Sequence, residues 1–209
     1  MVVVIQREQQ MSKRDVRICF VGDSFVNGTG DLAFLGWTGR LCAASLHDGI
    51  ELKHYNLGIR RDSSADIARR WHQEVQARFP DYSDNRIVFS FGVNDTTMVD
   101  GQPRVSMADS ITHARSMLTR AAEQYPVLMI GLLPIDDDAQ NERSKAVDAA
   151  YASLCAELKV SFLSVFDTMD QQQTWRRDAA ANDGTHPFAK GYEELAELVL
   201  AWESWWFTG

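Results

Sequence analysis

The chain has 209 residues, enough for one domain with a single large core, and 45% of them are hydrophobic, as in ordinary globular proteins. Its formal net charge is −8, from 21 basic and 29 acidic residues, and this disfavours a nucleic-acid partner because phosphates bind to basic surfaces. No apolar stretch approaches the roughly 20 residues that a membrane-spanning helix requires, so we expect no membrane span.

The chain begins with a segment that fits no regular element. We expect residues 1–14 to form a poorly ordered N-terminal extension and residues 15–209 to form one domain. The apolar run at residues 2–5 is too short for a secretory signal, and no basic residue precedes it. Met1 and Met11 both remain candidates for the true start.

The cysteines indicate the redox environment. There are three, Cys19, Cys42 and Cys155, an odd and sparse set that provides no disulfide framework. We therefore expect reduced thiols and a cytoplasmic location.

Five short apolar runs, rich in Val, Ile, Leu and Phe, are typical of parallel strands that are buried on both faces. They cover residues 16–21, 52–57, 87–91, 127–133 and 160–165. Between them, apolar residues recur at helical spacing along residues 67–79, 107–125 and 147–158. The alternation of strands and helices predicts a parallel sheet with right-handed crossovers. We expect an α/β fold, a three-layer α/β/α sandwich around five parallel strands.

Local signals mark where helices start. Ser63 and its neighbours supply capping oxygens for the helix that follows, and Pro187 suits the first position of the last helix. The acidic run at residues 136–138 lacks the spacing of a calcium-binding loop, so we expect a solvated loop and no metal.

The aromatic residues near the carboxyl end need a separate prediction. At helical spacing, Trp202 and Trp206 extend the apolar face of the last helix. Trp205 and Phe207 do not fit that face, and they could cover the sheet edge, contact a second subunit in a homodimer, or remain half exposed. We expect packing within the chain.

Two polar segments lie at opposite ends of the sequence and complement each other chemically. Ser24 follows the first buried strand directly, where a side chain becomes accessible. Asp183 and His186 are three positions apart and can share one short loop that turns toward that serine. The three side chains would supply a nucleophile, a general base and a group that orients the base.

His186 is the candidate base among five histidines. The other four, His47, His54, His72 and His113, lie in or beside predicted elements with no motif around them, so we expect structural roles for them. Asp183 would accept a hydrogen bond from the imidazole and fix its tautomer. The alternative for Asp183 is an ordinary Asx-turn, which the sequence Asn-Asp-Gly favours by itself.

A third polar segment follows the third apolar run and contains Asn94 and Asp95. An ester carbonyl becomes an oxyanion on attack, and the Ser24 N–H and the Asn94 side-chain amide are candidate donors to it. Asn-Asp is also a common turn, which is the alternative for Asn94. We expect Asp23 and Asp95 to support the site, with Asp23 bonding backbone amides that hold Ser24 in a tight turn.

Together, residues 18–25, 91–95 and 183–187 resemble the conserved blocks of the SGNH hydrolases, also called the GDSL esterase/lipase family. The resemblance extends from residue 16 to about residue 199. It implies a flavodoxin-like three-layer sandwich and a Ser24–His186–Asp183 triad that hydrolyses esters or thioesters without a metal or other cofactor.

The chain departs from the family pattern in its second block. Where the family usually has a glycine whose N–H joins the oxyanion hole, alignment on Asn56 and Asp62 places Arg61. We expect the Arg61 N–H to serve if its backbone dihedrals are ordinary, with Gly58 as the alternative donor. The guanidinium groups of Arg60 and Arg61 would then overlook the pocket, where they could bind an anionic substrate group or simply pair with surplus acidic residues.

We therefore expect a serine hydrolase that cleaves small or short-chain acyl esters through an acyl-enzyme. The same triad would also suit a carbohydrate O-deacetylase, a thioesterase or an acyltransferase. Two alternative hypotheses assign the protein no enzymatic activity: it would be an inactive interaction module, or a phosphate- or nucleotide-binding module. The glycine-bearing loop at residues 22–30 lacks the Gly-Lys-Ser/Thr ending of a P-loop, which disfavours the latter.

Overall fold

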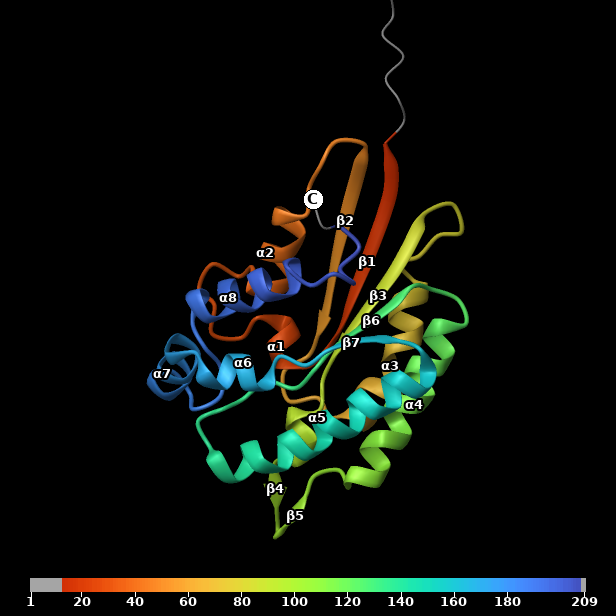
Figure 1. The fold of residues 1–209 in the computed structure, drawn as a ribbon. Coiled ribbons are helices and arrows are strands. Elements are labelled where there is room, and N and C mark those ends of the chain that lie inside the picture. Colours follow the sequence, from red (N-terminus) through yellow and green to blue (C-terminus); the bar gives the residue numbers. More distant parts are fainter. Residues whose placement is uncertain (1–12, 208–209) are drawn as a thin grey trace, which may run out of the picture.

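A five-stranded parallel sheet forms the centre of the protein, in a computed structural model that describes residues 13–207 (Figure 1). Its strand order is β2-β1-β3-β6-β7, and every neighbouring pair is parallel. The strands are β1 (Arg14–Gly22), β2 (Ile50–Gly58), β3 (Asp84–Ser90), β6 (Val127–Ile130) and β7 (Ser161–Leu163). The five predicted strands and the predicted fold class are confirmed.

Helices cover both faces of the sheet and complete the three layers (Figure 1). One face carries α3 (Ser64–Gln76), α4 (Met107–Ala122) and α5 (Asp138–Leu158). The other carries α1 (Ser24–Asn27), α2 (Gly36–Ala44), α6 (Phe166–Gln171), α7 (Gln173–Ala181) and α8 (Ala189–Leu200). A short helix, η1 (Val93–Thr96), leads into a hairpin of β4 (Met98–Val99) and β5 (Gln102–Pro103).

The expected extension at residues 1–14 lies almost wholly outside the described residues, and Arg14 is already the first residue of β1. Within residues 13–207, no helix combines the length and the apolar character needed to cross a bilayer.

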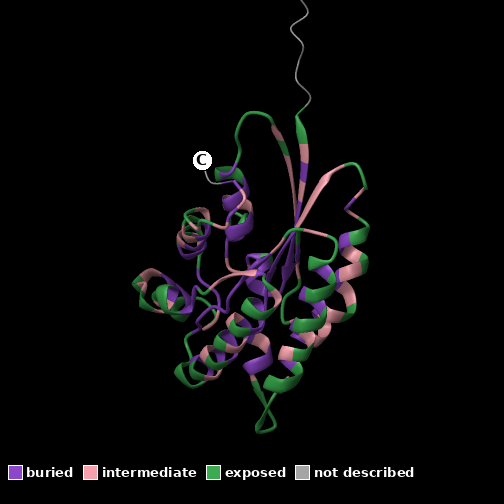
Figure 2. Cartoon of the chain, turned by 45° about the vertical axis from the view of Figure 1, so that its right-hand side comes forward, coloured by how far each residue is buried: buried purple, intermediate pink, exposed green. Residues whose placement is uncertain are grey.

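The core forms where the apolar runs predicted it, between the sheet and the two helical layers (Figure 2). In β1, five apolar side chains are fully buried: Val16, Ile18, Cys19, Phe20 and Val21. Because neighbouring side chains of a strand point to opposite faces, such a run must be covered on both sides. β1 therefore lies in the interior of the sheet, and its end is held firmly in place.

Helix starts follow the capping signals in part. At α3, the Ser63 hydroxyl accepts a bond from the Asp66 N–H, and the Asp66 carboxylate accepts one from the Ser63 N–H at 2.9 Å, which is a capping box. In the acidic run, the Asp137 side chain caps α5. The last helix, however, starts at Ala189 with Phe188 as its N-cap, so the placement of Pro187 at the first helical position is wrong.

The prediction for the terminal aromatic residues is also wrong in detail. Helix α8 ends at Leu200, so helical spacing does not continue through residue 206. Trp205 and Phe207 are the buried pair, whereas Trp202 and Trp206 are only partly buried. The Trp205 indole N–H donates to the Ser45 hydroxyl at 2.9 Å, which ties the chain end to the residue that follows α2. These buried rings pack within the chain.

The sheet topology brings three loops to one edge. Gly22, at the end of β1, pairs with Gly58 of β2 on one side and with Ser90 of β3 on the other. The segments that follow these three strands carry Ser24, the turn at residues 59–62, and Asn94. Gly58 lies so close to α1 that an added Cβ would approach the Asn27 nitrogen to 2.2 Å and the Asp23 oxygen to 2.6 Å. The helix that begins with Ser24 therefore rests directly on the end of β2.

We predict that Gly58→Ala destabilises the protein by about 1–3 kcal/mol, because the new methyl group would push against the α1 backbone. Thermal unfolding measures this as a Tm several degrees lower. Gly39→Ala is the matched control, since Gly39 lies inside α2 and its Cβ would meet only Leu35 side-chain atoms at ordinary contact distances. The control should be neutral or up to about 1 kcal/mol more stable. An unchanged Tm for Gly58→Ala would contradict the close approach.

Candidate active site

Ser24 lies at the start of the single-turn helix α1, directly after β1. The Asp23 carboxylate accepts a bond from the Phe25 N–H at 3.0 Å and so caps the helix, as expected for its local role. Gly28, with φ of +82°, ends it. Because the first amides of a helix have no partner within the helix, the Ser24 N–H is available to a ligand.

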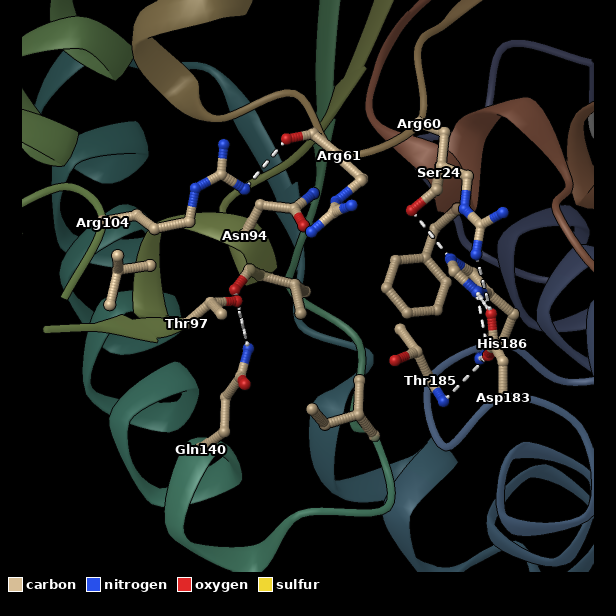
Figure 3. A pocket seen from close by; sticks show the side chains of 14 residues that line it. Ser24, Arg60, Arg61, Asn94, Thr97, Arg104, Gln140, Asp183, Thr185 and His186 are labelled. Atoms are coloured by element: carbon tan, nitrogen blue, oxygen red, sulfur yellow. Dashed lines mark hydrogen bonds and ion pairs between the residues drawn. The ribbon is translucent and has the colours of Figure 1, made fainter.

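Asp183 and His186 share a short loop between α7 and α8, and both turn toward Ser24 (Figure 3). The His186 Nε2 lies 2.7 Å from the Ser24 Oγ, and its Nδ1 lies 2.8 Å from the Asp183 Oδ2. The same carboxylate accepts the N–H groups of Thr185 at 3.1 Å and of His186 at 2.9 Å. The sequence offered an Asx-turn and a contact to the imidazole as alternative roles for Asp183. In the structure, Asp183 does both.

The directions of these hydrogen bonds follow from their partners. An ionised carboxylate only accepts, so the His186 Nδ1–H donates to Asp183, and a neutral imidazole then leaves Nε2 to accept the Ser24 proton. Burial lowers the pKa of His186, although the Asp183 carboxylate partly opposes this. Burial acts to raise the pKa of Asp183, but the His186 N–H and imidazole outweigh it and lower that pKa. Both shifts favour the neutral imidazole beside the carboxylate.

Asn94 lies in η1 at the end of β3 and lines the same pocket as Ser24. Its Nδ2 donates to the Asp62 carbonyl at 3.0 Å and lies 3.4 Å from the Asp23 carboxylate, so its second N–H is only weakly engaged. The Asp95 side chain points away from the cavity lining, toward α3 and α4. Its carboxylate accepts the Ser64 N–H at 2.8 Å and the Ser110 O–H at 2.6 Å, which fastens η1 to α3 and α4.

The turn after β2 determines whether Arg61 or Gly58, the two candidate backbone donors, lies beside the cavity. The Asp62 N–H donates to the Ile59 carbonyl at 3.2 Å, which closes a β-turn whose third residue is Arg61. Our reasoning for the Arg61 N–H assumed ordinary backbone dihedrals, and this condition is not met, since Arg61 has φ of +72°, a value that favours glycine. Its place in the cavity lining, and not its dihedrals, keeps it a candidate donor. The Gly58 N–H instead donates to the Asn56 side chain at 3.0 Å. Arg61 lines the cavity and Gly58 does not.

The cavity in front of Ser24 has a volume of about 560 Å³. Its charged lining residues are Arg60, Arg61, Arg104 and Asp183. The Arg60 guanidinium pairs with the Asp183 Oδ2 at 3.2 Å, so the expected pairing with an acid holds for Arg60. Within residues 13–207, the Arg61 side chain has no such partner.

Three features of the site were not predicted from the sequence. The Asp23 carboxyl is 1% exposed beside the serine, and its burial raises its pKa to about 7. Arg104 reaches the cavity because the β4–β5 hairpin folds back, and nothing in the sequence around it signals a binding role. Gln140 of α5 also lines the cavity, where its amide donates to the Thr97 hydroxyl at 3.1 Å.

Comparison of this structure with solved structures finds several similar folds. The lipase/acylhydrolase from Enterococcus faecalis is 21% identical with a TM-score of 0.69, covering 88% of this chain and 92% of that one. A member of the lipolytic protein G-D-S-L family from Veillonella parvula DSM 2008 is 19% identical with a TM-score of 0.70, covering 89% and 96%. Axe2, an acetylxylan esterase from Geobacillus stearothermophilus, is 18% identical with a TM-score of 0.68, covering 91% and 94%. Because these sequence identities are low, the structural similarity shows that the fold is shared and shows nothing about function.

No curated protein sequence matches this chain significantly. The sequence model of the GDSL-like lipase/acylhydrolase family, in contrast, matches residues 20–194. This range covers most of the chain and includes Ser24, Arg61, Asn94, Asp183 and His186. The chain therefore belongs to the GDSL-like lipase/acylhydrolase family and is a carboxylic ester hydrolase.

Proposed function

We propose that the protein hydrolyses small carboxylic esters through an acyl-enzyme formed on Ser24. The observation that supports this most strongly is the continuous chain of short hydrogen bonds from Ser24 through His186 to Asp183, at 2.7 and 2.8 Å. The serine end of that chain opens into the cavity, where an ester carbonyl can reach the hydroxyl. A serine hydroxyl needs such a neighbouring base because it is a weak nucleophile at neutral pH.

In the first stage, the Ser24 Oγ attacks the carbonyl carbon while the His186 Nε2 takes its proton. The Asp183 carboxylate stabilises the imidazolium that forms. The backbone N–H groups of Ser24 and Arg61 and the Asn94 side-chain amide donate hydrogen bonds to the oxyanion. The imidazolium then gives its proton to the departing alcohol.

In the second stage, a water molecule attacks the acyl-enzyme while His186 takes a proton from it. The acid leaves, and the proton returns to the Ser24 Oγ, so the enzyme is restored. Acyl transfer would follow the same route with another alcohol in place of water, and a thioester would differ only in its leaving group.

The dimensions of the site favour a small substrate. A cavity of about 560 Å³ is in the usual range for small-molecule sites, and Asn94, Thr97 and Gln140 contribute polar side chains to its lining. Since the similar structure of Axe2 is described as an acetylxylan esterase, acetylated sugars belong in the substrate screen. Chromogenic esters of increasing acyl length and an acyl-CoA complete it.

We predict that Ser24→Ala lowers kcat for para-nitrophenyl acetate by about 10⁴-fold or more while the protein stays folded. The variant removes only the attacking oxygen, so circular dichroism and Tm should be close to those of the wild type. Ser153→Ala is a suitable control, because Ser153 is an exposed residue of α5 whose hydroxyl bonds only the Ala149 carbonyl. If Ser24→Ala kept wild-type activity, the proposed nucleophile would be wrong.

We predict that kcat/KM rises with pH through a pKa below 6.5, the ordinary value for histidine, and is level at neutral pH. Protonated His186 cannot accept the Ser24 proton, so activity is lost as the pH falls through the lowered pKa of His186. The pH profile of Asp23→Asn serves as the control, because Asp23 titrates in a neighbouring range. The midpoint should stay below 6.5 in that variant. A midpoint that stays above 6.5 in Asp23→Asn would contradict the assignment to His186, because that variant removes the titration of Asp23 itself.

A further inference from the structure

We propose that the substrate carries a carboxylate or another anionic oxygen group, and that Arg61 and Arg104 bind this group beside the scissile ester. This inference rests on the proposed esterase function and identifies the class of ester. It starts from Arg61, the lining residue whose charge nothing else in the described structure satisfies.

The Arg61 side chain is directed into the cavity rather than back onto the protein surface. Figure 3 shows it reaching between Asn94 and Ser24. No hydrogen-bond acceptor or carboxylate within residues 13–207 contacts its guanidinium, whereas Arg60 pairs with Asp183. An unpaired guanidinium that faces a substrate cavity offers a fork of N–H donors matched to a carboxylate or phosphate.

Arg104 approaches the same part of the cavity from the β4–β5 hairpin. Its Nη1 donates to the Arg61 carbonyl at 2.9 Å, which holds both the turn and its own side chain in place. Its Nη2 is 3.8 Å from an Asp66 carboxylate oxygen, too far for a strong hydrogen bond. Arg104 is therefore anchored through one nitrogen and keeps other N–H groups for a ligand.

The carboxylates around the two arginines already have partners. Asp62 pairs with Arg70 at 2.7 Å, and Asp66 pairs with Arg69 and also bonds Ser63. Asp183, the one acidic residue of the cavity lining, is on the opposite side of the pocket in Figure 3 and is held by His186 and Arg60. An anionic group near Arg61 and Arg104 therefore meets positive charge and avoids the catalytic carboxylate.

The charge distribution over the whole chain adds to this argument. The formal net charge is −8, yet the charged lining of this cavity consists of three arginines and one aspartate. A positive cleft in a negative protein concentrates anionic ligands locally. Arg61 also has a backbone conformation, with φ of +72°, that a glycine would adopt without strain. Strained residues of this kind cluster at functional sites.

The test compares two esters that differ in charge but little in shape. Para-acetoxybenzoate carries a carboxylate, and para-acetoxybenzamide replaces it by a neutral amide; the meta isomers cover a second geometry. We expect the wild type to have a kcat/KM at least tenfold higher for one of the benzoates than for its amide. This charge preference should fall by about tenfold or more in Arg61→Gly, which suits the turn, and in Arg104→Gln. It should also weaken as salt is added.

Arg115→Gln is the matched control, because it removes one positive charge from an exposed ion pair between α4 and Glu157, outside the cavity lining. That variant should keep the wild-type charge preference. The proposal is overturned if neither benzoate is preferred in the wild type, or if the preference is the same in Arg61→Gly, Arg104→Gln and Arg115→Gln.

A binding measurement separates this proposal from the esterase function. Titration calorimetry with the isomeric hydroxybenzoates and hydroxybenzamides, which cannot react, needs no turnover. We expect at least one hydroxybenzoate to bind tenfold or more tightly than its amide, and Arg61→Gly to remove most of the difference. Charge-selective binding without hydrolysis of any ester would contradict the proposed function alone. Hydrolysis of both esters with equal binding of both products would contradict the charge preference alone.

Discussion

The hydrogen bonds that the Asp183 carboxylate accepts determine the geometry of the whole site. The carboxylate accepts backbone N–H groups from Thr185 and His186 and, in addition, the imidazole Nδ1–H, so one side chain fixes both the loop and the tautomer. With Nδ1 committed as a donor, Nε2 must accept, and the acceptor faces Ser24 at 2.7 Å. The exposed Arg60 guanidinium pairs with the same carboxylate at 3.2 Å. A short loop thereby delivers an oriented base to a serine 162 positions away.

The sheet supplies the other half of this geometry. The strand order places β1 between β2 and β3, so the segments after all three strands meet at one edge. Glycine is needed at the end of β1, where an added Gly22 Cβ would be 2.0 Å from the Ser90 carbonyl oxygen. This close packing leaves α1, the turn at residues 59–62 and η1 little freedom. The candidate oxyanion donors are therefore held before a substrate arrives, as electrostatic stabilisation of a transition state requires.

The fold and most of the site could be predicted because their signals are local. Continuous apolar runs mark strands that are buried on both faces, and Ser24 and Asn94 each follow such a run. Asp183 and His186 are three positions apart in one short loop, a spacing that the sequence shows directly. The errors arose where tertiary contacts override local patterns. Helix α8 stops at Leu200, so the buried aromatic residues are Trp205 and Phe207. The positive φ of Arg61 and the approach of Arg104 depend on turn and hairpin geometry, which residue spacing does not encode. The predicted cytoplasmic location stays a prediction, and a homodimer contact stays an alternative.

His186 and Asp183 make the Ser24 hydroxyl nucleophilic in the proposed mechanism, and covalent trapping of Ser24 can measure this. The protein is treated with a fluorophosphonate, which phosphonylates activated serine hydroxyls, and the adduct is located by tandem mass spectrometry. We expect a single adduct on Ser24, which forms in the wild type and forms far more slowly in His186→Ala. An unlabelled Ser24 in folded, ester-hydrolysing protein, or an adduct on another residue that accompanies loss of activity, would contradict this mechanism.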